Sequence, residues 1–175
     1  SAPPPKEEVF DKRNLATEYI EFGNKYYKLA QYDQAARFYQ LAEEYYTGVD
    51  AREGLVTANN SIGKVRFALG DTEGALAYYK KAEAIASGLG KSELLLQCVN
   101  NLGEISLRKG DFKEALSVFE KGLSSAGGQS EQGREKAVLL HNYAVALKAA
   151  DRLDEASQAI GKAKDLNLSA KRYEE

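Results

Sequence analysis

The sequence predicts an all-α fold built from four repeated helical hairpins, and three observations support this prediction. Small residues recur at intervals of 40, 40 and 41 positions, at Gly23, Gly63, Gly103 and Ala144. A second set of small residues lies twelve positions further on in each repeat, at Ala35, Ala75, Ala115 and Ala156. A large side chain follows four positions later, at Tyr39, Tyr79, Phe119 and Ile160. A repeat of about this length is typical of stacked helical hairpins.

The residues around each first small position favour an amphipathic helix, which is the first helix of the hairpin. Val99, Leu102, Gly103 and Ser106 show the three- and four-residue spacing of one helical face. Small residues allow two helices to approach closely, and the large residues fill the space on either side. Stacked hairpins then bury surface that a single hairpin cannot bury.

Turn residues separate the two helices of a hairpin. In "LGDTEGAL" and "KGDFKEAL", Gly70 and Gly110 stand where the end of a helix needs a left-handed residue. Asp71 and Asp111 follow them and are placed to cap the second helix. The first and fourth repeats carry other residues at the glycine position: Ala30 and Asp151.

The repeats account for most of the chain. A proline-rich lead-in occupies residues 1–8, and residues 9–175 are predicted to form a single domain. The four hairpins, with eight main helices, are expected at about residues 16–49, 56–89, 96–129 and 137–170. The final stretch "DLNLSAKRYEE" predicts either a short C-terminal capping helix or the beginning of a fifth repeat.

Composition argues against several classes of protein. A formal net charge of −2 without a dense basic cluster argues against binding to nucleic acid. The lack of a long apolar run argues against membrane insertion by this chain. Because Cys98 and His141 are the single cysteine and the single histidine, we expect no disulfide, metal or cofactor. The lack of methionine fits either an exported, periplasmic protein, processed and lipid-anchored through a lost N-terminus, or a cytoplasmic protein.

The repeat pattern resembles the tetratricopeptide repeat family. The shared features are the small residue of the first helix, the Gly-Asp turn of "KGDF", the alanine after it and the large residue four positions later. The period of 40 resembles that of the longer repeats in kinesin light chains, Pins-type cell-polarity adaptors and bacterial relatives. The resemblance implies a right-handed α-solenoid with its first helices on the concave side. It also implies a non-catalytic adaptor or scaffold that binds proteins.

Counting along the first helices places a set of side chains in the expected peptide-binding groove. Asn60, Asn100 and His141 are equivalent in successive repeats, and an asparagine amide can bind both backbone groups of an extended peptide. Such a row resembles the asparagine ladder of peptide-binding relatives. In the alternative, Asn60 and Asn100 are solvated, while Asn101 and Asn142 bond neighbouring helices. The full set of groove residues is Asn24, Tyr27, Asn60, Lys64, Phe67, Asn100, Asn101, Glu104, Arg108, His141, Asn142 and Lys148.

We therefore expect the chain to bind an extended peptide segment of a partner protein in this groove. Tyr27 and Phe67 would hold an apolar side chain of the partner. Four charged residues would set its charge preference, namely Lys64, Glu104, Arg108 and Lys148. The alternative is a self-assembling scaffold that forms homo-oligomers through its terminal repeats. The carboxylate clamp of the family is not expected, because Ile20 stands in the place of its first lysine.

Two further motifs do not indicate a phosphate-binding or a catalytic site. "GLGKSE" lacks the first glycine of a phosphate-binding loop, so we expect a helix end followed by Ser92 as N-cap of the next helix. Cys98 and His141 lie at non-equivalent faces of adjacent repeats, and no acid is placed to orient the histidine. We therefore expect no catalytic residue, and a half-buried structural cysteine at position 98.

Overall fold

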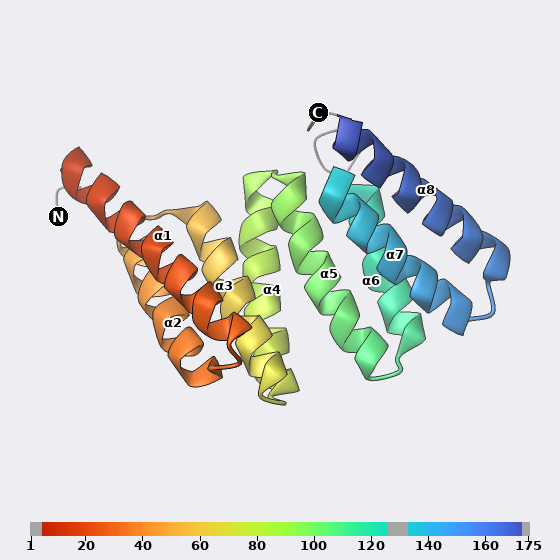
Figure 1. Cartoon of the computed structure of the whole chain (residues 1–175), viewed down its shortest axis with the longest axis horizontal. Coiled ribbons are helices and arrows are strands. Elements are labelled where there is room, and N and C mark those ends of the chain that lie inside the picture. Colours follow the sequence, from red (N-terminus) through yellow and green to blue (C-terminus); the bar gives the residue numbers. More distant parts are fainter. Residues whose placement is uncertain (1–4, 126–132, 173–175) are drawn as a thin grey trace. The chain divides into compact units, whose positions relative to one another are not determined.

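Eight α-helices make up the regular structure of the described residues (Figure 1). The computed structural model describes the backbone of residues 5–125 and 133–172 and the side chains up to residue 167. The predicted all-α fold of four successive hairpins is confirmed. The helices are α1 (Lys6–Lys28), α2 (Tyr32–Gly48), α3 (Arg52–Ala68), α4 (Thr72–Leu89), α5 (Ser92–Arg108), α6 (Phe112–Ser125), α7 (Gly133–Ala149) and α8 (Leu153–Arg172).

The chain divides into two compact units, Ser1–Leu89 and Gly90–Glu175, with two hairpins in each. In the first unit α1 packs against α2, α3 packs against α4, and α3 also contacts both helices of the first hairpin. In the second unit α5 packs against α6 and α7 against α8, while α7 also contacts α5 and α6. Each unit therefore repeats one arrangement, in which a first helix covers the preceding hairpin. The single domain over residues 9–175 stays a prediction.

The turn inside each hairpin has the same left-handed backbone. Gly70 (φ 84°) and Gly110 (φ 74°) confirm the two predicted glycine turns. Ala30 (φ 56°) and Asp151 (φ 59°) adopt the same conformation although each carries a Cβ. Because a left-handed backbone costs a residue with a Cβ roughly 1–2 kcal/mol, the outermost hairpins contain strained turns and the two middle hairpins contain relaxed ones.

Aspartate side chains cap the second helices of the two middle hairpins, as predicted. The backbone N–H of Gly74 donates to Oδ1 of Asp71 at 2.9 Å, and that of Glu114 donates to Oδ1 of Asp111 at 3.0 Å. The bond from Gly74, helped by a bond from Arg66, holds the pKa of Asp71 below its usual value. In the first hairpin the N-cap of α2 is Gln31, whose side chain makes no capping hydrogen bond.

The large side chain of each second helix faces the small residue of its first helix. In three hairpins the small residue is a glycine, and a Cβ there would overlap an aromatic ring; these pairs are Gly23 with Tyr39, Gly63 with Tyr79 and Gly103 with Phe119. The fourth hairpin changes both partners, because Ala144 replaces the glycine and Ile160 replaces the ring. The glycines are therefore required by close approach of the ring, not by their backbone conformation.

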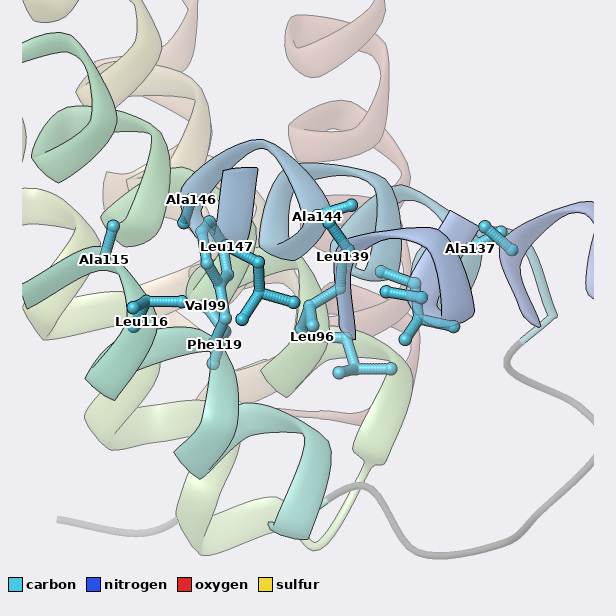
Figure 2. Packing of buried hydrophobic residues seen from close by; sticks show 14 residues of the cluster. Leu96, Val99, Ala115, Leu116, Phe119, Ala137, Leu139, Ala144, Ala146 and Leu147 are labelled. Carbon is cyan, nitrogen blue, oxygen red and sulfur yellow. The ribbon is translucent and has the colours of Figure 1, made fainter. Parts of the chain in front are cut away.

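Each unit has its own hydrophobic core. Figure 2 shows the core of the second unit, where buried side chains converge from α5, α6, α7 and α8. Phe119 and Leu147 are fully buried in it. The core of the first unit includes Ile20, Tyr39 and Ile62 from α1, α2 and α3. Full burial of one large apolar side chain contributes about 1.5–3 kcal/mol, so these interlocking clusters stabilise the contacts between successive hairpins within each unit.

Three local predictions differ from the structure. The first helix begins at Lys6 and so includes residues 6–8 of the expected lead-in. The residues after 164 continue α8 as far as Arg172 instead of forming a separate short helix, and Leu166 packs on the core of the second unit. Ser92 is the first residue of α5, and the N-cap is Lys91, without a side-chain capping bond. Residues 1–4 and 173–175 lie outside the described ranges.

No helix within the described ranges combines the length and the apolar character needed to cross a membrane.

Candidate functional site

The predicted groove residues lie on the four first helices, two of which belong to each unit. In the first unit α1 contributes Asn24 and Tyr27, and α3 contributes Asn60, Lys64 and Phe67. Asn24 and Lys64 are exposed, Tyr27 and Phe67 are half-buried, and Asn60 is buried. Because α1 and α3 contact each other, the structure brings these five residues onto two neighbouring helices.

A hydrogen-bond network fixes the side chain of Asn24. The hydroxyl of Tyr39 donates to Oδ1 of Asn24 at 2.8 Å, and the side chain of Ser61 also hydrogen bonds to this hydroxyl. Burial raises the pKa of Tyr39 to about 12; the nearby Tyr27 adds to this shift, and the bond with Ser61 opposes it. The phenol therefore stays neutral at physiological pH, and its one hydroxyl links α1, α2 and α3.

The repeat pattern in the sequence did not indicate that Tyr39 binds Asn24 or that Ser61 binds Tyr39. A signal was present, because Tyr39 faces Gly23 through the repeat register and Asn24 is the next residue along the chain. A phenol that packs on the small residue reaches past it toward the following side chain. The position after a small residue is therefore within reach of the hydroxyl when the large residue is tyrosine.

Tyr27 belongs to an aromatic pair at the end of the first hairpin. Its ring centroid lies 5.4 Å from that of Tyr32, with the two ring planes at 58°. Tyr32 is the first residue of α2, so the pair connects the end of α1 to the beginning of α2. Tilted aromatic pairs at this distance are attractive, and the pair therefore holds the Tyr27 ring in place.

In the second unit the side chain of Asn100 forms hydrogen bonds within the protein. Its Nδ2 donates to the backbone carbonyl of Glu135 at 3.3 Å, and Nδ2 of Asn142 donates to its Oδ1 at 3.5 Å. Asn100 thus ties α5 to α7, and the predicted bond from Asn142 to a neighbouring helix is confirmed. The alternative expectation that Asn60 and Asn100 are solvated is wrong, because their side chains are buried, with Asn60 5% and Asn100 8% exposed. Binding of a peptide by these amides stays a prediction.

The other predicted residues of the second unit are more accessible. Arg108 donates to Oε1 of Glu104 at 3.0 Å, one turn apart on α5, and the exposed pair contributes little to stability. His141 and Lys148 on α7 are exposed, and Asn101 is half-buried. The first helices of this unit therefore present acidic, basic and amide groups that can contact another molecule.

One row of positions differs chemically from hairpin to hairpin. The residue after the small position of the first helix is Asn24, Lys64, Glu104 or Val145 in the four hairpins. All except the half-buried Glu104 are exposed. The small residues and their large partners, in contrast, keep nearly the same chemistry in every hairpin. The residues that pack the helices together are therefore nearly the same in every hairpin, whereas the residues at these mostly exposed positions differ.

Titratable groups do not form a recognisable metal site in the described part of the chain. No three side chains of the His, Cys, Asp and Glu types come together there. Cys98 is fully buried in α5, not half-buried as the sequence suggested. The arrangement of the first helices can supply hydrogen bonds, charge and apolar contact.

Comparison with known proteins gives one match to a family model and several similar structures. Residues 54–127 match the model described as tetratricopeptide repeat. No curated protein sequence matches the chain. The crystal structure of BtubC (BKLC) from P. vanneervenii is similar with a TM-score of 0.75 and 22% identity, over 90% of this chain and 65% of that chain. The chain therefore spans less than two thirds of the length of BtubC.

Two further solved structures are similar at lower scores. A MamA crystal structure has a TM-score of 0.52 and 18% identity, over 92% of this chain and 96% of that chain. The TPR2AB domain of yeast Sti1, solved in a complex with pHSP90, has a TM-score of 0.57 and 17% identity, over 89% of this chain and 78% of that chain. At these identities the likeness concerns the fold alone.

Proposed function

We propose that the chain is a non-catalytic member of the tetratricopeptide repeat family, whose model matches residues 54–127, and that it binds an extended peptide segment of a partner protein through its first helices. In this proposal the chain has no catalytic activity of its own. Its partner is another protein, and the side chains on the first helices of each unit would recognise a particular segment of it.

The observation that carries the proposal is a contrast between two sets of equivalent positions. The solvent-facing residues differ from hairpin to hairpin, whereas the residues that pack the helices together are repeated. Asn24, Lys64, Glu104 and Val145 differ in charge and polarity, whereas the residues that hold the helices together are nearly uniform. A scaffold that only needed to stay folded would gain nothing from placing opposite charges at equivalent positions. A surface that distinguishes partners does gain from it, because charge complementarity sets specificity more than affinity.

The proposed roles follow from exposure. Tyr27 and Phe67 are half-buried aromatic side chains and would hold an apolar side chain of the peptide. The charge preference would come from Lys64, Glu104, Arg108 and Lys148. Asn60 and Asn100 would offer their amides to the peptide. The bonds of Asn100 to Glu135 and Asn142 use one of its two donor hydrogens and one of its two acceptor lone pairs.

An internal segment suits this site better than a free C-terminus. The TPR2AB domain of Sti1, a protein of similar fold, was solved with pHSP90. In this chain Ile20 occupies the place of the first lysine of the family's carboxylate clamp, and it is buried at 8% exposure. A buried isoleucine cannot neutralise a terminal carboxylate, so we expect recognition of residues within a chain.

A charge-exchange experiment tests the proposal. Peptides selected by the wild-type protein from a displayed library of extended sequences would be titrated against the double variant Lys64→Glu/Glu104→Lys. The matched control is Glu44→Lys/Lys80→Glu, which makes the same exchange at exposed positions of second helices. We expect the first variant to weaken binding by about tenfold or more and the control to leave it unchanged. Equal affinity of the two variants for every selected peptide would refute the site.

A further inference from the structure

A series of hydrogen bonds in the first unit runs in one direction through the hydroxyl of Tyr39. This hydroxyl donates to Oδ1 of Asn24 at 2.8 Å. Ser61 also bonds to it, and because that bond lowers the pKa of Tyr39, Ser61 donates to the phenol oxygen. The bonds therefore run from Ser61 on α3 through Tyr39 on α2 to Asn24 on α1.

The direction of these bonds fixes which end of the Asn24 amide is presented to solvent. Oδ1 accepts the hydroxyl hydrogen of Tyr39, so the acceptor end is held toward the protein. The Asn24 side chain as a whole is exposed, and its Nδ2 has no partner among the described residues. Nδ2 carries two donor hydrogens. Asn24 therefore offers hydrogen-bond donors to another molecule.

The hydroxyl that holds Asn24 is itself fixed in place. Tyr39 is 2% exposed, and its ring fills the space in which Gly23 would carry a Cβ. In the other hairpins the residue after the small position is not an amide, and the pairs are Lys64 with Tyr79, Glu104 with Phe119 and Val145 with Ile160. The first hairpin alone combines a tyrosine with an asparagine at these positions.

Two lysines flank the donors of Asn24. Lys28 lies one turn further along α1 on the same face, and Lys64 is the residue of α3 that is equivalent to Asn24. Ser61 lies one turn before Lys64, so the bonded series places Asn24 and Lys64 at the same contact between α1 and α3. Both lysines are exposed, and neither pairs with another described residue. Their charges are available to a bound group.

The carboxylates of α1 and α3 lie away from these donors. Glu21 is one turn before Asn24, but it is equivalent to Ser61. Because Ser61 lies on the side of α3 toward α1 and α2, Glu21 lies on the side of α1 that faces away from α3. Glu53 lies three turns before Lys64, about 16 Å along α3. The described part of the first unit thus presents donors and positive charge here without an adjacent anion.

The second unit does not offer the same chemistry. Its equivalents of Asn24 and Lys64 are Glu104 on α5 and Val145 on α7. Glu104 accepts a bond from Arg108 at 3.0 Å, so that positive charge is already paired. An anion would meet a like charge at Glu104 and no side-chain donor at Val145. A preference for an anion therefore belongs to the first unit.

We propose that the first unit binds the carboxylate of an aspartate or glutamate within the partner's segment, and that Tyr39 is a positioning residue that directs the Asn24 amide toward it. This acidic site rests on the peptide-binding function proposed above and names the chemistry of one residue of the peptide. The carboxylate accepts hydrogen bonds from Nδ2 of Asn24 and pairs with Lys28 and Lys64. Charge-assisted hydrogen bonds of this kind are about twice as strong as neutral ones.

Peptides selected by the wild-type protein from a displayed library of extended sequences are the probe, each made with an amidated C-terminus. Every Asp or Glu in them is replaced singly by Asn or Gln. We expect one acidic position at which this replacement weakens binding by about tenfold or more, and Lys64→Gln should reduce the difference. The matched control is Lys80→Gln, which removes an exposed lysine from the second helix of the same hairpin and should leave the difference unchanged.

Tyr39→Phe tests the positioning role, because it keeps the ring against Gly23 and removes the hydroxyl. It should weaken binding of the acidic peptide by about threefold and leave its amide counterpart unchanged, whereas a purely structural role would weaken both alike. In the Asn24→Ala background Tyr39→Phe should have no further effect. The control Tyr143→Phe, which removes a hydroxyl bonded to Glu120 in the second unit, should change neither peptide.

The acidic site is overturned if peptides bind without dependence on any Asp or Glu, or if Lys64→Gln leaves the difference unchanged. It is also overturned if a free C-terminus restores the affinity of an acid-to-amide peptide, because the ligand would then be a terminal carboxylate. Equal losses of both peptides in Tyr39→Phe would overturn the positioning role.

The acidic site and the groove fail in different ways. Peptides that Lys64→Glu/Glu104→Lys weakens, but that show no dependence on an acidic residue, would overturn the acidic site and leave the groove in place. Failure of every extended peptide to bind would overturn the groove itself, and the acidic site with it.

Discussion

The ring of Phe119 occupies the space in which Gly103 would carry a side chain. We therefore expect Gly103→Ala to lower the free energy of unfolding by about 1–3 kcal/mol, because the ring must move to admit the methyl group. The fourth hairpin holds the compensated pair, Ala144 with Ile160. Phe119→Ile in the Gly103→Ala background should restore part of the loss, and a double-mutant cycle by urea unfolding measures the coupling. Additive effects would show that the two residues are not in contact.

Removal of the Ala30 side chain should stabilise the protein. Its left-handed backbone (φ 56°) is strained for alanine and free for glycine, so Ala30→Gly should raise the free energy of unfolding by about 0.5–1 kcal/mol after the entropy of the unfolded chain is included. The control is Gly70→Ala at the equivalent turn (φ 84°), which should lower it by a similar amount. A lower urea midpoint for Ala30→Gly would contradict the strain.

Asn59 is a buried polar residue that the fold does not fully satisfy. Its Nδ2 donates to the carbonyl of Leu55 at 2.7 Å, but its Oδ1 has no hydrogen-bond partner among the described residues. The third hairpin has Val99 at this position. Asn59→Val should therefore stabilise the protein by about 1 kcal/mol, since a buried unsatisfied acceptor costs about 1–3 kcal/mol.

The reverse exchange, Val99→Asn, is the matched control for this prediction. It buries a new amide in the core of the second unit and should lower the thermal midpoint clearly. If Asn59→Val is as destabilising as Val99→Asn, the oxygen of Asn59 has a partner and the prediction is wrong.

Tyr39 should make stability fall at high pH. Its pKa is raised to about 12 in the folded protein, above the value of 10.0 for a free tyrosine. The group therefore contributes stability that is fully present below pH 10 and is lost as the pH rises toward 12. Tyr39→Phe removes this contribution together with the bond to Asn24. The difference in unfolding free energy between the wild type and Tyr39→Phe should thus shrink between pH 10 and pH 12, and a constant difference would count against the assignment.

Much of the fold could be predicted because the repeat register encodes packing directly. A small residue and a large one at a fixed separation specify a helix crossing, whatever the local propensities are. The register even locates the turns at Ala30 and Asp151, where no glycine marks the left-handed residue. The repeat register specifies the first residue of a helix less well. Ser92 was expected as the N-cap of α5, but it is the first residue of the helix and Lys91 is the N-cap.

The candidate site was harder to predict than the fold. Helical counting tells which side of its own helix a residue occupies, but it does not tell which neighbouring helix covers that side. Asn100 was assigned to an open groove, and its burial depends on Glu135 and Asn142, 35 and 42 residues away. His141 at the equivalent position is exposed because no later helix of the described residues covers it.

The uneven quality of the turns has a kinetic consequence. The hairpins α3–α4 and α5–α6 have a left-handed glycine and a capping aspartate, so each can form its turn from local interactions alone. The hairpins α1–α2 and α7–α8 have Ala30 and Asp151 at their turns and need contacts with the neighbouring hairpin to offset the strain. Each unit therefore contains one hairpin suited to nucleate folding and one that forms on it as a template. Folding should proceed from residues near the middle of the chain toward both ends, and unfolding should begin at the ends.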